Sequence, residues 1–259
     1  MPNEAETLIH PEWLRPDWNL PHVHAFMTTR AGGSSQGPHA SMNVGRAVQD
    51  DPQAVAANRA RVSQALGTPA IFMPQVHGTA VLLLRAEHGL TDAEIPKADA
   101  SVSTTPGLGV AIQVADCLPV LFAAPRAVAG AHAGWRGLAA GVLENTVAAL
   151  CDEAHCRPAD IHAWMGACIG PEAFEVGAEV REAFAGVGGG DEFFVYRANA
   201  AGEPRWRADL AGLARRRLQG LGLAAISGGG CCTFSDSRFF SYRRERFSGR
   251  MVAAIALRG

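Results

Sequence analysis

The chain has 259 residues, a length that suits one large domain or two small ones and suffices to bury a hydrophobic core. Hydrophobic residues make up 48% and charged residues 19%, a balance that excludes a largely disordered chain. Lys plus Arg is 23 against Asp plus Glu at 25, so the formal net charge of -2 argues against nucleic acid or an anionic membrane as a partner.

The first residues, MPNEAETLIHPEWLRPDW, contain acidic side chains and no apolar core, so they match neither a secretory signal nor a transit peptide. The apolar runs of the chain are far shorter than the roughly 20 residues that span a bilayer. We therefore expect a cytoplasmic protein without a membrane segment, in which the six cysteines remain reduced.

The first predicted elements are a strand and a helix joined by a glycine-rich loop. A strand is predicted over residues 22–29, and the loop from Arg30 to Gly45 follows it. Asp51 and Pro52 form an N-cap and first-turn pair, and Gly67 ends the helix that they begin. The stripe of this helix that repeats at helical spacing consists of Val55, Arg59, Val62 and Leu66.

The middle of the chain is rich in predicted strands, which cover residues 70–73, 80–84, 100–103, 109–114, 118–123 and 127–131. The remaining elements are a helix over 138–153, a strand over 161–165, helices over 177–184 and 208–221, and closing strands over 239–242 and 251–257. The sequence contains no internal repeat, and no linker divides these elements into separate domains. We therefore predict one α/β domain over residues 1–259, with a mixed sheet and helices outside it.

Three short segments place metal-binding side chains next to predicted strands: His77 in QVHG, Cys117 in ADCLP and His132 in HAGWRG. Loops at strand ends are where α/β folds commonly gather functional groups. Two imidazoles and one thiolate leave the fourth position of tetrahedral zinc open, as in catalytic rather than structural zinc sites.

The same residues also suit nucleophilic catalysis, and their spacing does not separate the two alternatives. In this second hypothesis Cys117 is the nucleophile, His132 is its base, and Asp116 or Asp99 orients the base.

Six polar residues lie in or beside turns that contain Gly or Ser, and we expect them to face the site: Arg30, Asn43, Arg46, Arg136, Arg243 and Arg244. Guanidinium groups match phosphate geometry, and the loop glycines allow backbone N–H groups to approach an anion. Arg46 is our choice for the phosphate contact, because it closes the glycine-rich loop just after Asn43 and Gly45; Arg30 and Arg136 are the alternatives for this contact. The alternative is that these arginines lie on surface loops, are solvated, and have no role in a site.

The other cysteines fit structural roles better than catalysis. Cys151 and Cys156 lie on or just after a predicted helix and are interpreted as structural. Cys231 and Cys232 are adjacent, and consecutive strand positions point to opposite faces, so the two side chains cannot easily share one metal.

Seven motifs, in this order, closely resemble the YfiH-like family over nearly the whole chain: TRAGGS at 29–34, SMNVG at 41–45, QVHG at 75–78, ADCLP at 115–119, HAGWRG at 132–137, CIGP at 168–171 and FSYRR at 240–244. The resemblance implies a layered α/β/β/α sandwich, related to cysteine-hydrolase-like folds, and a zinc site whose ligands match His77, Cys117 and His132.

The family is variously labelled multicopper polyphenol oxidoreductase (laccase), purine nucleoside phosphorylase and peptidoglycan editing factor. A multicopper oxidase needs roughly ten His ligands for its copper centres. The chain has nine His in total and a single His-x-His, at His22 and His24. We therefore reject four-copper oxidation, although copper could occupy the zinc site in a preparation.

The resemblance thus implies a zinc-dependent enzyme that uses phosphate to cleave adenosine, inosine, guanosine and methylthioadenosine and that also deaminates adenosine. Zinc lowers the pKa of water toward about 7, which serves deamination. One alternative that the resemblance implies is an amide hydrolase that removes L-Ser from a UDP-MurNAc precursor, through the metal or the Cys117 thiolate. Another is a zinc-binding protein without catalytic activity.

Overall fold

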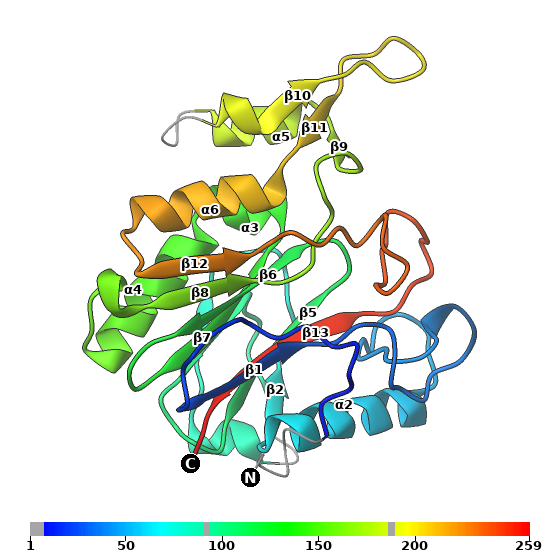
Figure 1. Ribbon diagram of the computed structural model, residues 1–259. Coiled ribbons are helices and arrows are strands. Elements are labelled where there is room, and N and C mark those ends of the chain that lie inside the picture. Colours follow the sequence, from blue (N-terminus) through cyan, green and yellow to red (C-terminus); the bar gives the residue numbers. More distant parts are fainter. Residues whose placement is uncertain (1–7, 91–93, 186–189) are drawn as a thin grey trace.

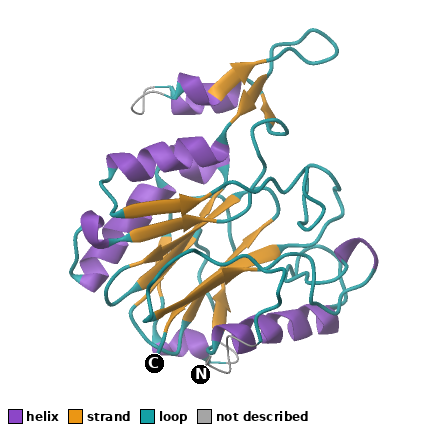
Figure 2. Cartoon of the chain, viewed as in Figure 1, coloured by secondary structure: helices purple, strands orange, loops and turns teal. Residues whose placement is uncertain are grey.

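The computed structural model describes residues 8–90, 94–185 and 190–259, and these form stacked layers of helices and sheets (Figures 1 and 2). Helix α2 covers one outer face of a four-stranded sheet, a six-stranded sheet packs on the inner face, and helices α3, α4 and α6 cover the far side. The predicted α/β/β/α sandwich with mixed sheets is confirmed.

The helices of the described residues are α2 (Pro52–Leu66), α3 (Trp135–Ala140), α4 (Val142–Ala154), α5 (Ala178–Phe184) and α6 (Leu210–Gly220). The strands are β1 (Val23–Met27), β2 (Ala70–Phe72), β3 (Val81–Leu83), β4 (Ala100–Ser103), β5 (Gly109–Val114), β6 (Leu118–Ala123), β7 (Val128–Ala133), β8 (His162–Met165), β9 (Glu175–Val176), β10 (Phe194–Tyr196), β11 (Trp206–Ala208), β12 (Ala225–Gly228) and β13 (Met251–Leu257).

The four-stranded sheet has the order β1-β13-β5-β2 and is buried on both faces. Along β13 the odd-numbered side chains from Met251 to Ile255 point into the core between the sheets, and the even-numbered ones from Val252 to Ala256 point toward α2. A strand covered on both sides reads as a continuous apolar run, which explains why the sequence indicates it so clearly.

The six-stranded sheet has the order β12-β8-β6-β7-β4-β3 and carries two of the candidate site segments. Strands β6 and β7 are antiparallel neighbours in register from Leu118 opposite Ala133 to Ala123 opposite Val128. The register therefore places Cys117, just before β6, beside the end of β7 that holds His132. The third sheet, β10-β11-β9, lies with α5 beyond α6, outside the stacked layers (Figure 1).

The predicted helix over 138–153 is wrong as a single element. The chain forms α3 and α4 instead, because Gly141 adopts a left-handed φ of 98° and its N–H bonds back to the end of α3. The helical segment also begins earlier than predicted, at Trp135, so Trp135 and Arg136 lie just after the strand that holds His132.

The predicted strand over 239–242 is also wrong. Phe239 and Phe240 are fully buried, so the segment has the composition of a strand, but it forms turns. The guanidinium of Arg244 donates to the Phe239 carbonyl over 2.6 Å and thereby occupies an acceptor that a sheet ladder would need. Four short strands, β9 to β12, were not predicted.

Among the described residues no helix combines the length and the apolar composition that crossing a bilayer requires.

Truncation of Phe122 tests the packing beneath the six-stranded sheet. Phe122 is fully buried on β6, and Phe122→Ala is expected to lower the free energy of unfolding by about 3–5 kcal/mol, because a large cavity remains. Urea unfolding measures the change. The matched control is Phe247→Ala, since the Phe247 side chain is 73% exposed; equal losses for both variants would contradict the assigned core.

Candidate active site

His77, Cys117 and His132 come together at one edge of the stacked sheets. One ligand atom from each lies within 4.8 Å of those of the other two. His77 belongs to the loop between β2 and β3, Cys117 precedes β6, and His132 is the penultimate residue of β7. The Sγ of Cys117 is 3.8 Å from Nε2 of His77, and the two imidazole rings meet edge to face at 4.8 Å. Among the described residues this is the one group of three such ligands.

These residues fit a tetrahedral metal. Zinc bonds of about 2.3 Å to sulfur and about 2.0–2.1 Å to nitrogen imply a sulfur–nitrogen separation of about 3.6 Å, close to the 3.8 Å found. The Nδ1 of His132 is bonded to a carboxylate, which leaves its Nε2 for coordination. His77 is exposed, Cys117 half-buried and His132 buried, so the group opens to one side.

The buried carboxylate of Asp99 organises two of the three ligands. Its Oδ1 accepts hydrogen bonds from Nδ1 of His132 over 2.8 Å and from the backbone N–H of His77 over 2.8 Å. Its Oδ2 accepts from the N–H groups of Val76 and Gly78 over 3.1 and 2.7 Å. His77 adopts a left-handed φ of 62°, and these three N–H bonds hold the loop in that conformation.

The electrostatics of the group favour a charged pair. Burial raises the pKa of the Cys117 thiol, but the charge of His132 and hydrogen bonds from His132 and His77 outweigh burial and lower it. Burial lowers the pKa of His132, but the Cys117 charge and the bond to Asp99 raise it well above its usual range. Hydrogen bonds from His132 and the loop backbone overcome burial and lower the pKa of Asp99. The lowered pKa favours the thiolate form of Cys117, which is the form that binds metals.

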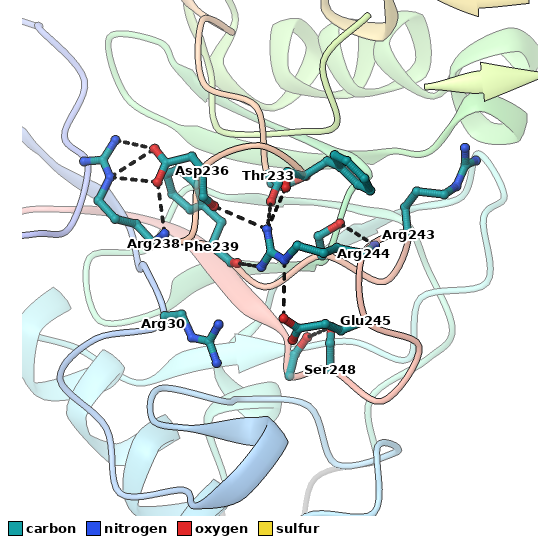
Figure 3. Close-up of polar contacts among 12 residues, drawn as sticks. Arg30, Thr233, Asp236, Arg238, Phe239, Arg243, Arg244, Glu245 and Ser248 are labelled. Atoms are coloured by element: carbon teal, nitrogen blue, oxygen red, sulfur yellow. Dashed lines mark hydrogen bonds and ion pairs between the residues drawn. The ribbon is translucent and has the colours of Figure 1, made fainter. Parts of the chain in front are cut away.

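Asp116 connects Cys117 to a second loop. It has a left-handed φ of 86°, and its carboxylate accepts from the Thr233 hydroxyl over 2.6 Å and from the Arg243 N–H over 2.7 Å. Arg244 holds the same loop from within: its guanidinium donates to the carbonyls of Thr233 and Phe239 (Figure 3). The Arg244 side chain thus stabilises the loop, whereas the Arg243 side chain points away from these hydrogen bonds.

A cavity of about 940 Å³ adjoins the three ligand candidates. Its polar and charged lining side chains, besides these three, are Arg46, Arg59, Gln75, Gln113, Asp116, Arg136, Tyr242, Arg243 and Arg250. Trp135, Ile169 and Phe174 add apolar surface to the lining. A cavity that combines apolar and aromatic side chains with hydrogen-bonding groups suits a small organic substrate.

The sequence-predicted polar residues divide into two sets. Arg46, Arg136 and Arg243 line the cavity. Arg30 does not: its Nε donates to the Ala40 carbonyl over 3.0 Å and its guanidinium lies over the Phe240 ring. Asn43 does not line it either, because its side chain is fully buried and bonds to neighbouring backbone.

Two cavity arginines were not singled out from the sequence. Arg59 carried a signal, since a charged residue within the Val55, Val62 and Leu66 stripe of a helix is out of place unless its head reaches something polar. Arg250 carried none, because nothing in its neighbourhood along the chain distinguishes it from a solvated loop arginine.

The remaining cysteines lie outside the cavity lining. Cys151 is half-buried on α4 and packs against the core beneath the six-stranded sheet, and Cys156 packs there too. The Sγ of Cys232 accepts a hydrogen bond from the Gly170 N–H over 3.1 Å, and the backbones of Cys232 and Cys168 form an isolated parallel β-bridge, with both thiols free. Cys231 packs on the core between the sheets.

The chain is similar to known proteins over nearly its whole length. It is 46% identical to Purine nucleoside phosphorylase PA4543 of Pseudomonas aeruginosa over 95% of this chain and 98% of that protein. It is 45% identical to Purine nucleoside phosphorylase YfiH of Escherichia coli over 96% and 98%. The crystal structure of Neisseria meningitidis protein NMB0706, of the DUF152 family, matches with a TM-score of 0.86 and 42% identity over 95% and 99% of the two chains.

The family model described as multi-copper polyphenol oxidoreductase laccase matches residues 24–258. Agreement among this match, the relatives named YfiH and the shared fold leaves one assignment. The chain belongs to the YfiH family.

Proposed function

We propose that this protein is a zinc-dependent purine nucleoside phosphorylase, with His77, Cys117 and His132 as the metal ligands. The carrying observation is the coincidence of this ligand group with a cavity that several arginines line, in a chain 46% identical to a protein named purine nucleoside phosphorylase. Adenosine, inosine, guanosine and methylthioadenosine are the proposed nucleosides, and adenosine deamination is a proposed second activity.

The side chains divide the proposed task. Zinc, when bound, supplies a Lewis acid with one open position. Asp99 fixes the His132 ring and the His77 backbone. Arg46, Arg136 and Arg243 attract the phosphate or orient the substrate, while Arg30 and Asn43 act from behind by holding the loops. In phosphorolysis a phosphate oxygen bonds to the anomeric carbon as the glycosidic C–N bond breaks, and the base leaves with a proton.

The products identify the reaction. Purified protein of measured metal content, expected at about one zinc per chain, is offered adenosine with and without phosphate. We expect adenine and ribose 1-phosphate only when phosphate is present, and inosine with ammonia in either case, as identified by mass spectrometry. Release of L-Ser from a serine-containing muramoyl precursor, with adenosine unchanged, would contradict the proposal and favour the amide hydrolase.

Substitution of individual cysteines tests the ligand assignment. Cys117→Ala is expected to abolish both nucleoside turnover and zinc retention, because it removes the one thiolate of the group. Cys151→Ala is the matched control and should retain both, since Cys151 packs on α4 away from the cavity. Elemental analysis and product assays measure the two properties. Equal losses in the two folded variants would show that the site is misplaced.

Asp99→Asn tests the role of the buried carboxylate. The amide would offer one acceptor oxygen in place of two and would turn N–H donors toward the donors of the 76–78 loop. We expect zinc affinity, measured by competition with a chromophoric chelator, to fall about 10–100-fold. Asp160→Asn, on a partly exposed carboxylate that bonds to Arg157 outside the cavity lining, is the control. An unchanged zinc affinity in the Asp99 variant would remove Asp99 from the site.

A further inference from the structure

The arginines of the cavity differ from those elsewhere in their partners. Outside the cavity, arginines commonly pair with carboxylates, as Arg207 does with Glu175 over 2.6 Å and Arg217 with Glu144 over 2.8 Å. Within the described part of the chain, none of the five arginines that line the cavity takes part in such an ion pair. The cavity therefore gathers five guanidinium groups without a carboxylate of the described residues at ion-pair distance, although Asp116 and Cys117 in the same lining are near enough to act on one of them, Arg250.

Arg59 is the most constrained of these side chains. It is half-buried, its guanidinium lies 4.1 Å above the Phe72 ring, and it donates to the Val44 carbonyl over 2.8 Å and to Oε1 of Gln113 over 3.1 Å. Burial and the nearby charge of Arg46 lower its pKa to about 10. These two bonds leave further N–H groups of the fork unused, beside a cavity. A cation held in this way is costly unless an anion meets it.

Arg250 also lines this cavity, near the group formed by His77, Cys117 and His132. Its Nη1 donates to the Ser248 and Gly249 carbonyls, which fixes the plane of the guanidinium and leaves Nε and Nη2 for another partner. The side chain lies close enough to Cys117 and Asp116 for their charges to act on it. A ligand held by Arg250 would thus lie beside the candidate metal centre.

The backbone of residues 43–45 joins the two arginines into one structure. The Oδ1 of Asn43 accepts from the N–H groups of Gly45 and Arg250 over 2.9 and 2.8 Å, and Val44 bonds to both Arg59 and Arg250 through its carbonyl and N–H. A Cβ on Gly45 would lie 2.7 Å from Cγ of Arg250, so glycine is needed for this approach. Hydrogen bonds to residues 43–45 therefore hold Arg59 and Arg250 in fixed positions relative to each other.

We propose that Arg59 and Arg250, with the exposed Arg46 at the rim, form a subsite for a phosphate oxyanion beside His77, Cys117 and His132. Several guanidinium forks converging from different elements suit a group with three or four equivalent oxygens better than a single planar carboxylate. The catalytic meaning of the subsite rests on the proposed phosphorolysis, whereas anion binding itself does not. Orthophosphate and the phosphate ester of a nucleotide share this chemistry.

Calorimetric titration of the metal-loaded protein distinguishes the two sources of phosphate. Orthophosphate and adenosine 5′-monophosphate are titrated separately, with adenosine as the uncharged reference. Arg59→Gln and Arg250→Gln are each expected to weaken binding of the recognised phosphate about tenfold or more, because each removes a charge-assisted contact. Arg59→Lys and Arg250→Lys, which keep the charge, should show smaller losses. Arg61→Gln, an exposed arginine on the same helix, should bind like the wild type.

The same variants separate this subsite from the proposed reaction. Arginine-dependent phosphate binding without ribose 1-phosphate formation would support the subsite and contradict the phosphorylase. Phosphorolysis with an unchanged KM for phosphate in folded Arg59 and Arg250 variants would support the phosphorylase and overturn the subsite. Failure of the wild type to bind either phosphate compound would overturn it as well. Thermal unfolding of each variant without ligand establishes that it is folded.

Discussion

The candidate site depends on one buried carboxylate. Asp99 accepts from the His132 ring and from three consecutive backbone N–H groups around His77, so a single side chain aligns one ligand and shapes the loop that presents another. The same residue is joined to the sheet, because its carbonyl accepts from the His132 N–H over 2.7 Å. Without this carboxylate the loop N–H groups would lack their acceptors, and the left-handed backbone at His77 would lose its support.

The sandwich turns that local arrangement into a cavity. The β6–β7 register brings Cys117 beside His132, while α2 and the segment before β13 contribute Arg59 and Arg250 from the other sheet. The site therefore spans both sheets, and the core between them sets the separation of its two walls. Arg136 follows β7 closely and the Arg243 N–H bonds to Asp116, so guanidinium-bearing residues also lie on the side of the metal-ligand candidates.

Part of this arrangement was accessible from sequence, and particular residues show the boundary. The α2 helix was predicted from its Asp51 cap and Gly67 stop, and β13 from its apolar run. The split of the 138–153 helix at Gly141 was missed, because an isolated glycine in a helical pattern is often tolerated. The false strand at 239–242 arose from its two phenylalanines, which are buried in the core between the sheets although their segment forms turns.

The sequence alone determined the α/β class, the longer helices and strands such as α2 and β13, and the three short motifs that contain His77, Cys117 and His132, because these depend on local periodicity and composition. Only the tertiary structure decided that Asp99, rather than Asp116, orients His132, and that Asn43 supports the loop instead of lining the cavity. It likewise revealed Arg59 and Arg250 as neighbours of the site. The physical reason is that hydrogen bonds and unpaired charges are set by distances between segments up to some two hundred residues apart, which spacing along the chain does not encode.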